Sequence, residues 1–422
     1  MLQVPFIRQN REQVLERLTV KHFAELGLID DLLGLDDRRR NLTVQSEQIK
    51  ASVNSASKEI GQLLAKGERD KAEARKQEVA GLSAGLTPID AELAQVEKEL
   101  HAILVRIPNL PSPRVPVGRT PEDNVVVRTG GVRPKLPAKA LPHWDLAKKY
   151  QLIDFELGTK ITGSGFPVYI NKGAKFQRAL IQYFLDYNTE SGYREYQVPI
   201  MVNEASAYGT GQLPDKEAQM YVVPEDGFYL IPTAEVPLTN LYRDEILKET
   251  DLPVRLTGYT PCFRREAGSY GKDVRGLNRL HQFDKIELVQ LVPPEKSYEV
   301  LEEMVAHVER LLQSLQLEYR ILRLCGGDMG FTSALTYDFE VFSAAQEKWL
   351  EVSSVSNFEA YQTNRMKIRY KDTKGKTQLL HSLNGSSLAL PRIVACLLEN
   401  HQTEEGIALP ESLHRYYGAT QI

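Results

Sequence analysis

The side chains best suited to chemistry lie in one segment, residues 263–287, which reads FRREAGSYGKDVRGLNRLHQFDKIE. Its opening predicts a β-strand that carries Arg264 and Glu266 on one face, because strand side chains alternate with a period of two. An arginine there can hold a phosphate with two hydrogen bonds, and a nearby carboxylate can accept from an amino group.

A glycine-rich, charged loop follows these two residues. Residues 267–277 combine three glycines with Lys272, Asp273 and Arg275, so we expect a mobile loop with a cationic tip. Phe283 then returns on a second predicted strand, with its ring available to a base. Strand, loop and strand together suit a nucleoside triphosphate and an acceptor nucleic acid.

Two short segments carry further polar groups. Residues 230–240, LIPTAEVPLTN, place Thr233 near Glu235, a hydroxyl and a carboxylate that suit an α-ammonium group; taken alone, this pattern is a common helix start. Residues 350–357, LEVSSVSN, predict a strand with Glu351 beside Ser353 and Ser354. These are hard oxygen ligands of the kind that Mg²⁺ accepts, although alone they indicate only a polar strand.

The last such segment is residues 382–402, SLNGSSLALPRIVACLLENHQ, which predicts a strand, a turn at residues 384–385 and a helix. Pro391 suits the first helical turn, where its missing N–H costs nothing. Arg392 follows it, although a helix start already carries partial positive charge. A polyphosphate bound at this end of the helix would explain the arginine.

An N-terminal region must form a long helical arm. Apolar residues recur every seven positions from Leu42 to Leu63, and again in steps of four and three from Leu82 to Ile107. This spacing predicts an antiparallel coiled-coil hairpin that turns at residues 66–70. About 35 residues per helix give roughly 50 Å of length. We expect Pro88 to kink or loosen the second helix and Ser46 to weaken the seam.

The rest of the chain divides at a proline-rich stretch. Eight prolines between residues 108 and 142 exclude a continued helix, so we expect three regions: an N-terminal domain (1–107), a linker (108–149) and a catalytic domain (150–422). In the catalytic domain, apolar residues from Phe176 to Tyr187 lie on one face of a predicted helix, and Gly192 should end that helix. Residues 193–202 alternate like a strand, interrupted by Pro199, which belongs at an edge or a chain–chain boundary.

Composition limits the class of protein. The 422 residues are 42% hydrophobic with a net charge of −4, so a sizeable core is expected and any nucleic-acid contact must be local. The cysteines Cys262, Cys325 and Cys396 form neither a disulfide framework nor a CxxC metal site. Neither a signal peptide nor an apolar run of about 18 residues is visible. We expect a cytoplasmic protein without membrane contact.

Residues 263–287 resemble motif 2 of the class II aminoacyl-tRNA synthetases, and residues 382–402 resemble motif 3 of that family. Three features resemble the seryl-tRNA synthetase family in particular: the sequence motif HQFDKIE, the sequence motif LNGSSLALPR and the coiled-coil arm. The resemblance implies an α+β fold: the hairpin, plus a class II domain with a mainly antiparallel sheet flanked by helices. It also implies a homodimer formed through the unit that contains Pro199.

The implied activity is ATP-dependent attachment of serine to serine tRNA through seryl-adenylate, extending to selenocysteine tRNA, with Mg²⁺ as cofactor and the arm contacting the tRNA. Catalysis is assigned to Arg264 and Arg392, and metal binding to Glu351 and Ser354. The implied serine site comprises Thr233, Ala234, Glu235, Arg264, Glu287, Asn384 and Ser386. The implied ATP site comprises Arg264, Arg265, Glu266, Leu280, Phe283, Glu351, Val352, Ser353, Ser354 and Arg392.

The sequence differs from that expected for the family in two segments, and two alternative functions are considered. Residues 330–342, GFTSALTYDFEVF, replace a turn richer in glycine and alanine, outside the implied ligands, and Ser386-Ser387 replaces the commoner Ser-Gly. His281 is interpreted as a structural imidazole rather than a base. A coiled-coil scaffold protein leaves Arg264, Glu351 and Arg392 unexplained. A ligase that loads an amino acid onto a carrier protein would be favoured by loss of the arm.

Overall fold

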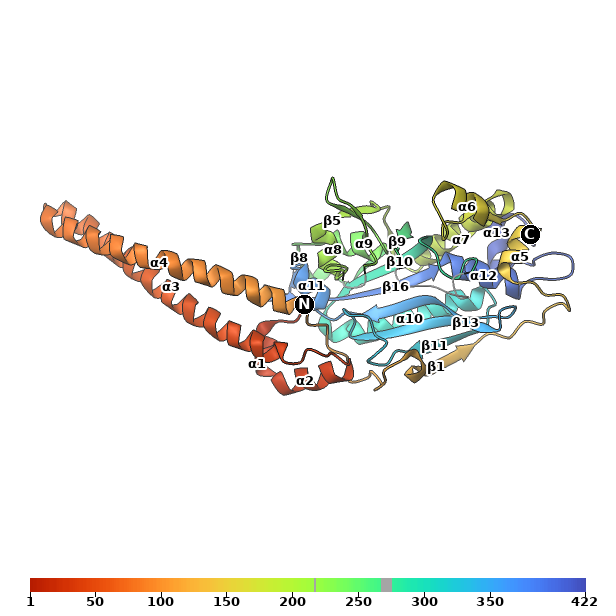
Figure 1. Cartoon of the computed structure of the whole chain (residues 1–422), viewed down its shortest axis with the longest axis horizontal. Helices are drawn as coiled ribbons and strands as arrows, with labels where there is room; N and C mark the ends of the chain where they lie inside the picture. The colour runs from red at the N-terminus through yellow and green to blue at the C-terminus, as the bar shows by residue number, and fades with distance from the viewer. Residues whose placement is uncertain (216–217, 267–274) are drawn as a thin grey trace. The chain divides into compact units, whose positions relative to one another are not determined.

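The computed structural model describes residues 1–215, 218–266 and 275–422 and divides into two compact units (Figure 1). One comprises residues 2–19 and 23–108; the other comprises Met1, residues 20–22 and residues 109–422. The expected tip of the glycine-rich loop, residues 267–274, lies outside the described residues.

The first unit is dominated by a helical hairpin. Its helices are α1 (Val4–Gln9), α2 (Arg11–Val20), α3 (Leu28–Ala65) and α4 (Arg69–Leu104). Ion pairs join α3 to α4 near both ends of the hairpin, Arg38 to Glu92 at 2.6 Å and Glu59 to Arg75 at 2.9 Å. Along α3 the residue number rises from Arg38 to Glu59, whereas the number of the partner on α4 falls from Glu92 to Arg75. The two helices are therefore antiparallel (Figure 1). The predicted hairpin is confirmed.

The two expected weak points of the hairpin are both accommodated. Ser46 is buried at the seam, and its hydroxyl donates a 2.7 Å hydrogen bond to Asp90 across the hairpin. Pro88 is exposed, and α4 continues through it as one helix. Its neighbours Leu86 and Ile89 are half-buried, so packing on both sides of the proline supports a helix that has lost one backbone hydrogen bond.

The second unit is built on an eight-stranded sheet in the order β1-β11-β12-β13-β16-β10-β9-β4 (Figure 1). Neighbours are antiparallel except for β4, which runs parallel to β9. The mainly antiparallel sheet is as expected. The strands are β1 (Val125–Gly130), β4 (Arg194–Glu195), β9 (Val254–Phe263), β10 (Gln282–Val292), β11 (Tyr319–Arg323), β12 (Leu335–Ser343), β13 (Lys348–Asn357) and β16 (His381–Ala389).

Strand β10 separates the core from the site. Ile286, Leu288 and Val292 point from one face into a large core shared with helices α7 (Asn171–Glu190), α10 (Ser297–Ser314) and α12 (Leu390–Asn400). On the other face Val289 and Leu291 pack in a second, smaller cluster. This alternation leaves the start of that second face free for polar side chains.

The proline-rich stretch carries structure of the second unit. Residues 125–130 form β1, an edge strand paired with β11, and residues 143–149 form helix α5 (His143–Lys149), which packs on α12. The prolines do exclude a long helix here. They are compatible with an edge strand because they flank it rather than interrupt its hydrogen bonding.

The strand expected at residues 193–202 is instead two short strands in different sheets. Residues 194–195 form β4 at the edge of the main sheet, whereas β5 (Met201–Asn203) pairs with β7 (Phe228–Leu230) in a three-stranded sheet. Pro199 lies between them, where neither ladder needs its missing N–H. Gly192, with φ +88°, follows the end of α7 as predicted.

Shorter elements complete this unit. They are β2 (Ile153–Asp154), α6 (Phe155–Ile161), β3 (Val168–Tyr169), α8 (Glu204–Thr210), β6 (Tyr221–Val223), β7 (Phe228–Leu230), α9 (Glu235–Asn240), β8 (Ile246–Lys248), α11 (Tyr361–Arg365), β14 (Arg369–Lys371), β15 (Thr377–Leu379) and α13 (Glu411–Tyr417), with 3-10 turns at Pro121–Asp123, Glu249–Asp251 and Pro294–Lys296. Within the described ranges, every helix is too short or too polar to cross a membrane.

Candidate active site

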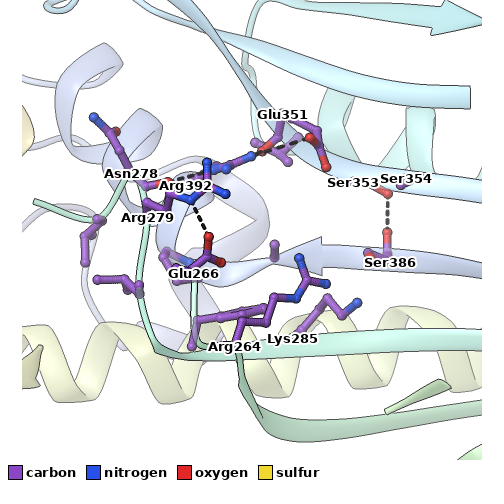
Figure 2. Close-up of a pocket in the computed structure, with 16 residues that line it drawn as sticks. Arg264, Glu266, Asn278, Arg279, Lys285, Glu351, Ser353, Ser354, Ser386 and Arg392 are labelled. Atoms are coloured by element: carbon purple, nitrogen blue, oxygen red, sulfur yellow. Dashed lines mark hydrogen bonds and ion pairs between the residues drawn. The ribbon is translucent and has the colours of Figure 1, made fainter. Parts of the chain in front are cut away.

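Two adjoining cavities open on the polar face of the main sheet. The first lies between β10, β13, β16 and the start of α12 (Figure 2), and the second extends toward α9 and the start of β12. The residues that line both cavities are Arg264, Glu266, Arg279, Lys285, Ser354 and Ser386. Two ligands bound in these cavities would therefore meet at a shared, strongly charged wall.

Strand β10 supplies three side chains to the two cavities through its period of two. Phe283 faces the first cavity, Lys285 faces both, and Glu287 faces the second. Glu287 is fully buried; one carboxylate oxygen, Oε2, accepts from Lys285 Nζ at 2.7 Å and from Thr233 Oγ1 at 3.1 Å. Its other oxygen, Oε1, has no hydrogen-bond partner among the residues that the structure describes. Because a buried acceptor without a partner costs free energy, a ligand with a hydrogen-bond donor at this position would be stabilised.

Glu235 is the second carboxylate of the second cavity. It begins α9 and accepts a 2.6 Å hydrogen bond from Gln362 Nε2. Burial, reinforced by the negative charge of Glu287, raises the pKa of Glu235 to about 7. Two neighbouring buried carboxylates make this end of the cavity attractive to a cation.

Two β-bulges determine which side chains of β13 and β16 face the cavities. On β13, Val352 has no counterpart, since Glu340 pairs with Glu351 and Phe339 with Ser353. Glu351 and Ser354, three residues apart, therefore share a face. On β16, two residues stand opposite Ile286 of β10, so Ser386 and Ala389 also share a face. Leu388, inside that bulge, has a φ of +128°, a conformation that strongly favours glycine.

Arg392 lies in the first turn of α12 and reaches the rim of the first cavity (Figure 2). Its Nη1 donates to the backbone oxygen of Glu351 at 2.7 Å, and its Nε donates to the backbone oxygen of Asn278 at 3.0 Å. These two bonds orient the guanidinium while leaving further N–H donors for a ligand.

The predicted strand placement of Arg264 and Glu266 is wrong. Strand β9 ends at Phe263, and Glu266 has a φ of +49°, which a strand does not allow. Both side chains nevertheless reach the cavities. Arg264 lies 5.3 Å from the ring centre of Phe283, and Glu266 forms an ion pair with Arg279 (Figure 2).

The turn expected at residues 384–385 is also absent, because β16 continues through it. Asn384 still lines the second cavity, while Leu280, Val352 and Ser353 line the first. Two implied ligands lie elsewhere: the exposed Arg265 is outside both linings, and Ala234 is buried in the smaller core cluster.

His281, interpreted from the sequence as a structural imidazole, packs against neighbouring aromatic residues. Its ring stacks on Phe166 at 5.4 Å, and its Nδ1 lies 3.1 Å from the hydroxyl of Tyr221. These contacts keep the imidazole outside the lining of both cavities.

Several lining residues were missed from the sequence. Lys285 lies midway between Phe283 and Glu287 and could have been found by strand alternation. Asn278 and Arg279 follow the glycine-rich loop, and nothing local distinguishes them. The segment 330–342, expected to lie outside the site, contributes Gly330, Thr332, Ser333, Thr336 and Asp338 to the second cavity. Ser387 instead points away from the cavities and donates to Asn188 at 2.9 Å.

The donor set near Glu351 fits a hard divalent cation. Glu351 and Ser354 present a carboxylate and a hydroxyl on one face, and Ser354 pairs with Asp338 on β12. Burial and the charge of Glu351 raise the pKa of Asp338 well above its usual range, and its Oδ1 has no partner among the described residues. The carboxylates of Glu351 and Asp338 therefore repel each other when both are ionised, and a cation would relieve that repulsion, although the described residues contain no group of three or more His, Cys, Asp or Glu arranged for a metal.

Comparison with known families assigns both units of the chain. Residues 221–401 match the model of the tRNA synthetase class II core domain (G, H, P, S and T), and residues 1–111 match the seryl-tRNA synthetase N-terminal domain. Six of the eight strands of the main sheet, and the whole lining of the first cavity, lie within the matched range, so the second unit contains the core of a class II aminoacyl-tRNA synthetase.

Individual relatives are similar over the whole chain. The serine–tRNA ligase of Salinibacter ruber is 50% identical, covering 100% of this chain and 99% of the relative, and that of Methylacidiphilum infernorum is 47% identical over 99% of both. Among solved structures, the seryl-tRNA synthetase of Pyrococcus horikoshii complexed with ATP superposes with a TM-score of 0.92 at 33% identity, covering 100% of this chain and 99% of that one. The chain belongs to the seryl-tRNA synthetase family.

It is thus an ATP-dependent ligase that charges serine tRNA with serine through seryl-adenylate. Neither alternative is favoured. A scaffold protein would not need the class II core, and a ligase for a carrier protein is disfavoured by the seryl-tRNA synthetase N-terminal domain.

Proposed function

We propose that the first cavity binds ATP and the second binds serine, so that the reacting groups meet at Arg264. The observation that carries this assignment is the shared wall between a cavity with Phe283 and Arg392 and a cavity with two buried carboxylates. An aromatic ring and a guanidinium suit a nucleotide, and carboxylates suit an amino acid's ammonium group.

In the ATP cavity, Phe283 stacks on adenine, with Glu266 and the backbone near Leu280 reading the edge of the base. Arg264 holds the α-phosphate together with the carboxylate of serine, and Arg392 holds the γ-phosphate. The contacts of Arg392 with two backbone oxygens support this role, because they preorganise the guanidinium before ATP arrives.

In the serine cavity, Glu235 and Thr233 receive the ammonium group, and Glu287 accepts from the serine hydroxyl. The partnerless Oε1 of Glu287 supports this assignment, since serine supplies the donor that the described residues lack. Ser386 and Asn384 complete the hydroxyl end of the cavity.

The reaction then needs positioning and charge neutralisation rather than a nucleophilic side chain. The serine carboxylate attacks the α-phosphorus, the bond to the bridging oxygen breaks, and pyrophosphate leaves. A ribose hydroxyl at the 3′ end of the tRNA then takes the seryl group, and AMP leaves. Arg264 holds the two reacting groups together in the first step.

Glu351 and Ser354 would hold Mg²⁺, with Asp338 in support, and the ion would neutralise charge on the phosphates of ATP. The cross-strand pairing of Asp338 with Ser354 supports this donor set, because it brings a second carboxyl group beside the hydroxyl.

The test of this proposal is pyrophosphate exchange into ATP with each of the twenty amino acids. Serine should stimulate exchange far above the other nineteen. Exchange that is equal for serine and alanine would overturn the assignment of the second cavity.

We further propose that residues 1–107 bind the body of serine tRNA through the hairpin, and that residues 150–422, with β1 and α5, carry catalysis. We also propose that the enzyme charges selenocysteine tRNA with serine, which can be checked by aminoacylation of that transcript. The three cysteines are buried and unpaired, which suits the proposed cytoplasmic location.

A homodimer is proposed through the edge strand β4. Arg194 and Glu195 are both exposed, and Pro199 follows them, as expected at a chain–chain boundary. Light scattering of the purified chain should give twice the mass of 47.7 kDa.

A further inference from the structure

A buried polar network lies behind the first cavity. His143 begins α5, and Glu399 lies near the end of α12; both side chains are 0% exposed. Nδ1 of His143 is 2.7 Å from Glu399 Oε1, and the backbone N–H of His143 donates to the same oxygen at 2.9 Å.

The second ring nitrogen of His143 holds the chain that returns from the glycine-rich loop. The backbone N–H of Leu277 donates to Nε2 at 2.8 Å. Nε2 is therefore an acceptor, so Nδ1 carries the proton and donates to Glu399. The imidazole thus bridges α12 to the backbone of residue 277.

Gln346 makes a second connection from Glu399 to the same stretch. Its Nε2 donates to Glu399 Oε1 at 2.8 Å, and its Oε1 accepts from Asn278 Nδ2 at 2.9 Å. The backbone oxygen of Asn278 in turn accepts from Arg392, and Figure 2 shows these two residues together at the cavity wall. The carboxylate of Glu399 is thus connected to Leu277 through His143 and to Asn278 through Gln346.

Contacts at residues 275 and 276 bring the chain against α5. Gly276 has a φ of +67°, and a Cβ added there would lie 2.2 Å from Nε2 of His143. Arg275 lies over the ring of Trp144, 4.5 Å from its centre. The path of residues 275–278 is therefore determined by close contact with the start of α5.

We infer that His143 is a positioning residue for ATP: by accepting from Leu277, it fixes the stretch that leads into Arg279 and Leu280 of the first cavity. The inference rests on the proposed binding of ATP in that cavity. His143 itself lies outside the lining and touches no substrate. It acts through the backbone of residues 277–278.

Two substitutions separate this role from a purely structural one. His143→Asn keeps a donor at the position of Nδ1, so Glu399 remains paired, but nothing reaches Leu277. His143→Gln keeps an acceptor at the distance of Nε2, so Leu277 remains paired. Kinetics of pyrophosphate exchange and the thermal midpoint are measured for both full-length variants.

The inference predicts that His143→Asn raises the KM for ATP about tenfold, because the Leu277 N–H is left buried without an acceptor. The KM for serine should stay within about twofold of the parent, and His143→Gln should restore most of the ATP affinity. An ATP KM unchanged in His143→Asn would overturn the inference, as would equal increases in the KM for ATP and serine.

Two further variants keep the test decisive. If His143→Asn does not fold, Gln346→Met, at a half-buried position, removes the hold on Asn278 and should show the same selective rise. Arg392→Ala reports on the ATP site itself. A raised ATP KM in Arg392→Ala, with none in the network variants, refutes only the role of His143. An unchanged ATP KM in all of them refutes the ATP site and the inference with it.

Discussion

Arg264 lines both cavities, so in the proposed reaction it touches the α-phosphate and the carboxylate that attacks it. Arg264→Ala should lower the rate of serine-dependent pyrophosphate exchange by on the order of 10²-fold or more, because it removes a charged donor from the transition state. Arg264→Lys serves as the control and should lose less, since it keeps the charge without the two-pronged geometry. Exchange at the parent rate in the alanine variant would remove Arg264 from the site.

Glu287 should determine selectivity for the hydroxyl group. A hydrogen bond to a charged group contributes roughly 1.5–3 kcal/mol, so Glu287→Ala should lower kcat/KM for serine by about 10- to 150-fold. The small activity with alanine should change much less, because alanine has no hydroxyl. Both activities are measured by pyrophosphate exchange, with Glu287→Gln as the control of matched shape. Equal losses for both amino acids would show that Glu287 does not read the hydroxyl.

Glu235 gives the serine site a pH dependence. Its pKa is raised to about 7 by burial and by Glu287, and the ionised form is needed to pair with the ammonium group. As the pH falls through 7, the carboxyl takes up a proton, so the KM for serine should rise, approaching tenfold per pH unit. Gln362→Met removes a donor to the carboxylate and should shift this rise to higher pH. A serine KM that is constant between about pH 6 and 8 would contradict the assignment; the KM for ATP is the internal control.

Among the elements, those with a regular period could be predicted from sequence and those with local irregularities could not. The heptads of α3 and α4 and the apolar face of α7 extend over many turns, so their signal is strong. The end of β9 at Phe263 and the bulges at Val352 and in β16 each depend on one or two residues held by tertiary contacts. The network of His143 could not be anticipated, because it joins residues 256 positions apart.

The charge of the hairpin is also less uniform than its composition indicates. Of the five basic residues between positions 38 and 58, Arg38 and Lys50 pair across the hairpin with Glu92 and Asp90, and Arg39 pairs with Asp36. Acidic residues of α4 therefore neutralise part of the positive charge of α3. Within the described residues, Arg40 and Lys58 are exposed and form no ion pair, so they are the better candidates for contacts with phosphate.

Charge reversal at those two positions should weaken tRNA binding. Arg40→Glu and Lys58→Glu should each lower affinity and reduce the slope of log K against log salt by about one, since each contact releases about one counterion. Filter binding at several salt concentrations measures both quantities. Arg38→Glu is the comparison, because its charge is already paired with Glu92. Slopes equal to that of the parent would place the phosphate contacts elsewhere.

At the scale of the whole molecule, the two units should be separable in function. Deleting residues 46–90 with a short glycine-rich bridge keeps the Arg38–Glu92 pair at the new end of the hairpin. Pyrophosphate exchange should stay near the parent rate, because both cavities are lined by residues beyond 211. Aminoacylation of serine tRNA should collapse. A folded deletion variant that charges tRNA as well as the parent would make the hairpin a scaffold element.

The bulge at Val352 limits how this part of the chain can change in length during evolution. Deleting one residue there would restore regular alternation and turn either Glu351 or Ser354 to the opposite face of the sheet. A single inserted residue would have the same effect. Insertions and deletions in β13 are therefore tolerated only when they change its length by two residues. The exposed turn around Gly375, between β14 and β15, has no such restriction. Among descendants of this sequence, insertions and deletions should accumulate at the turn and spare the spacing from Glu351 to Ser354.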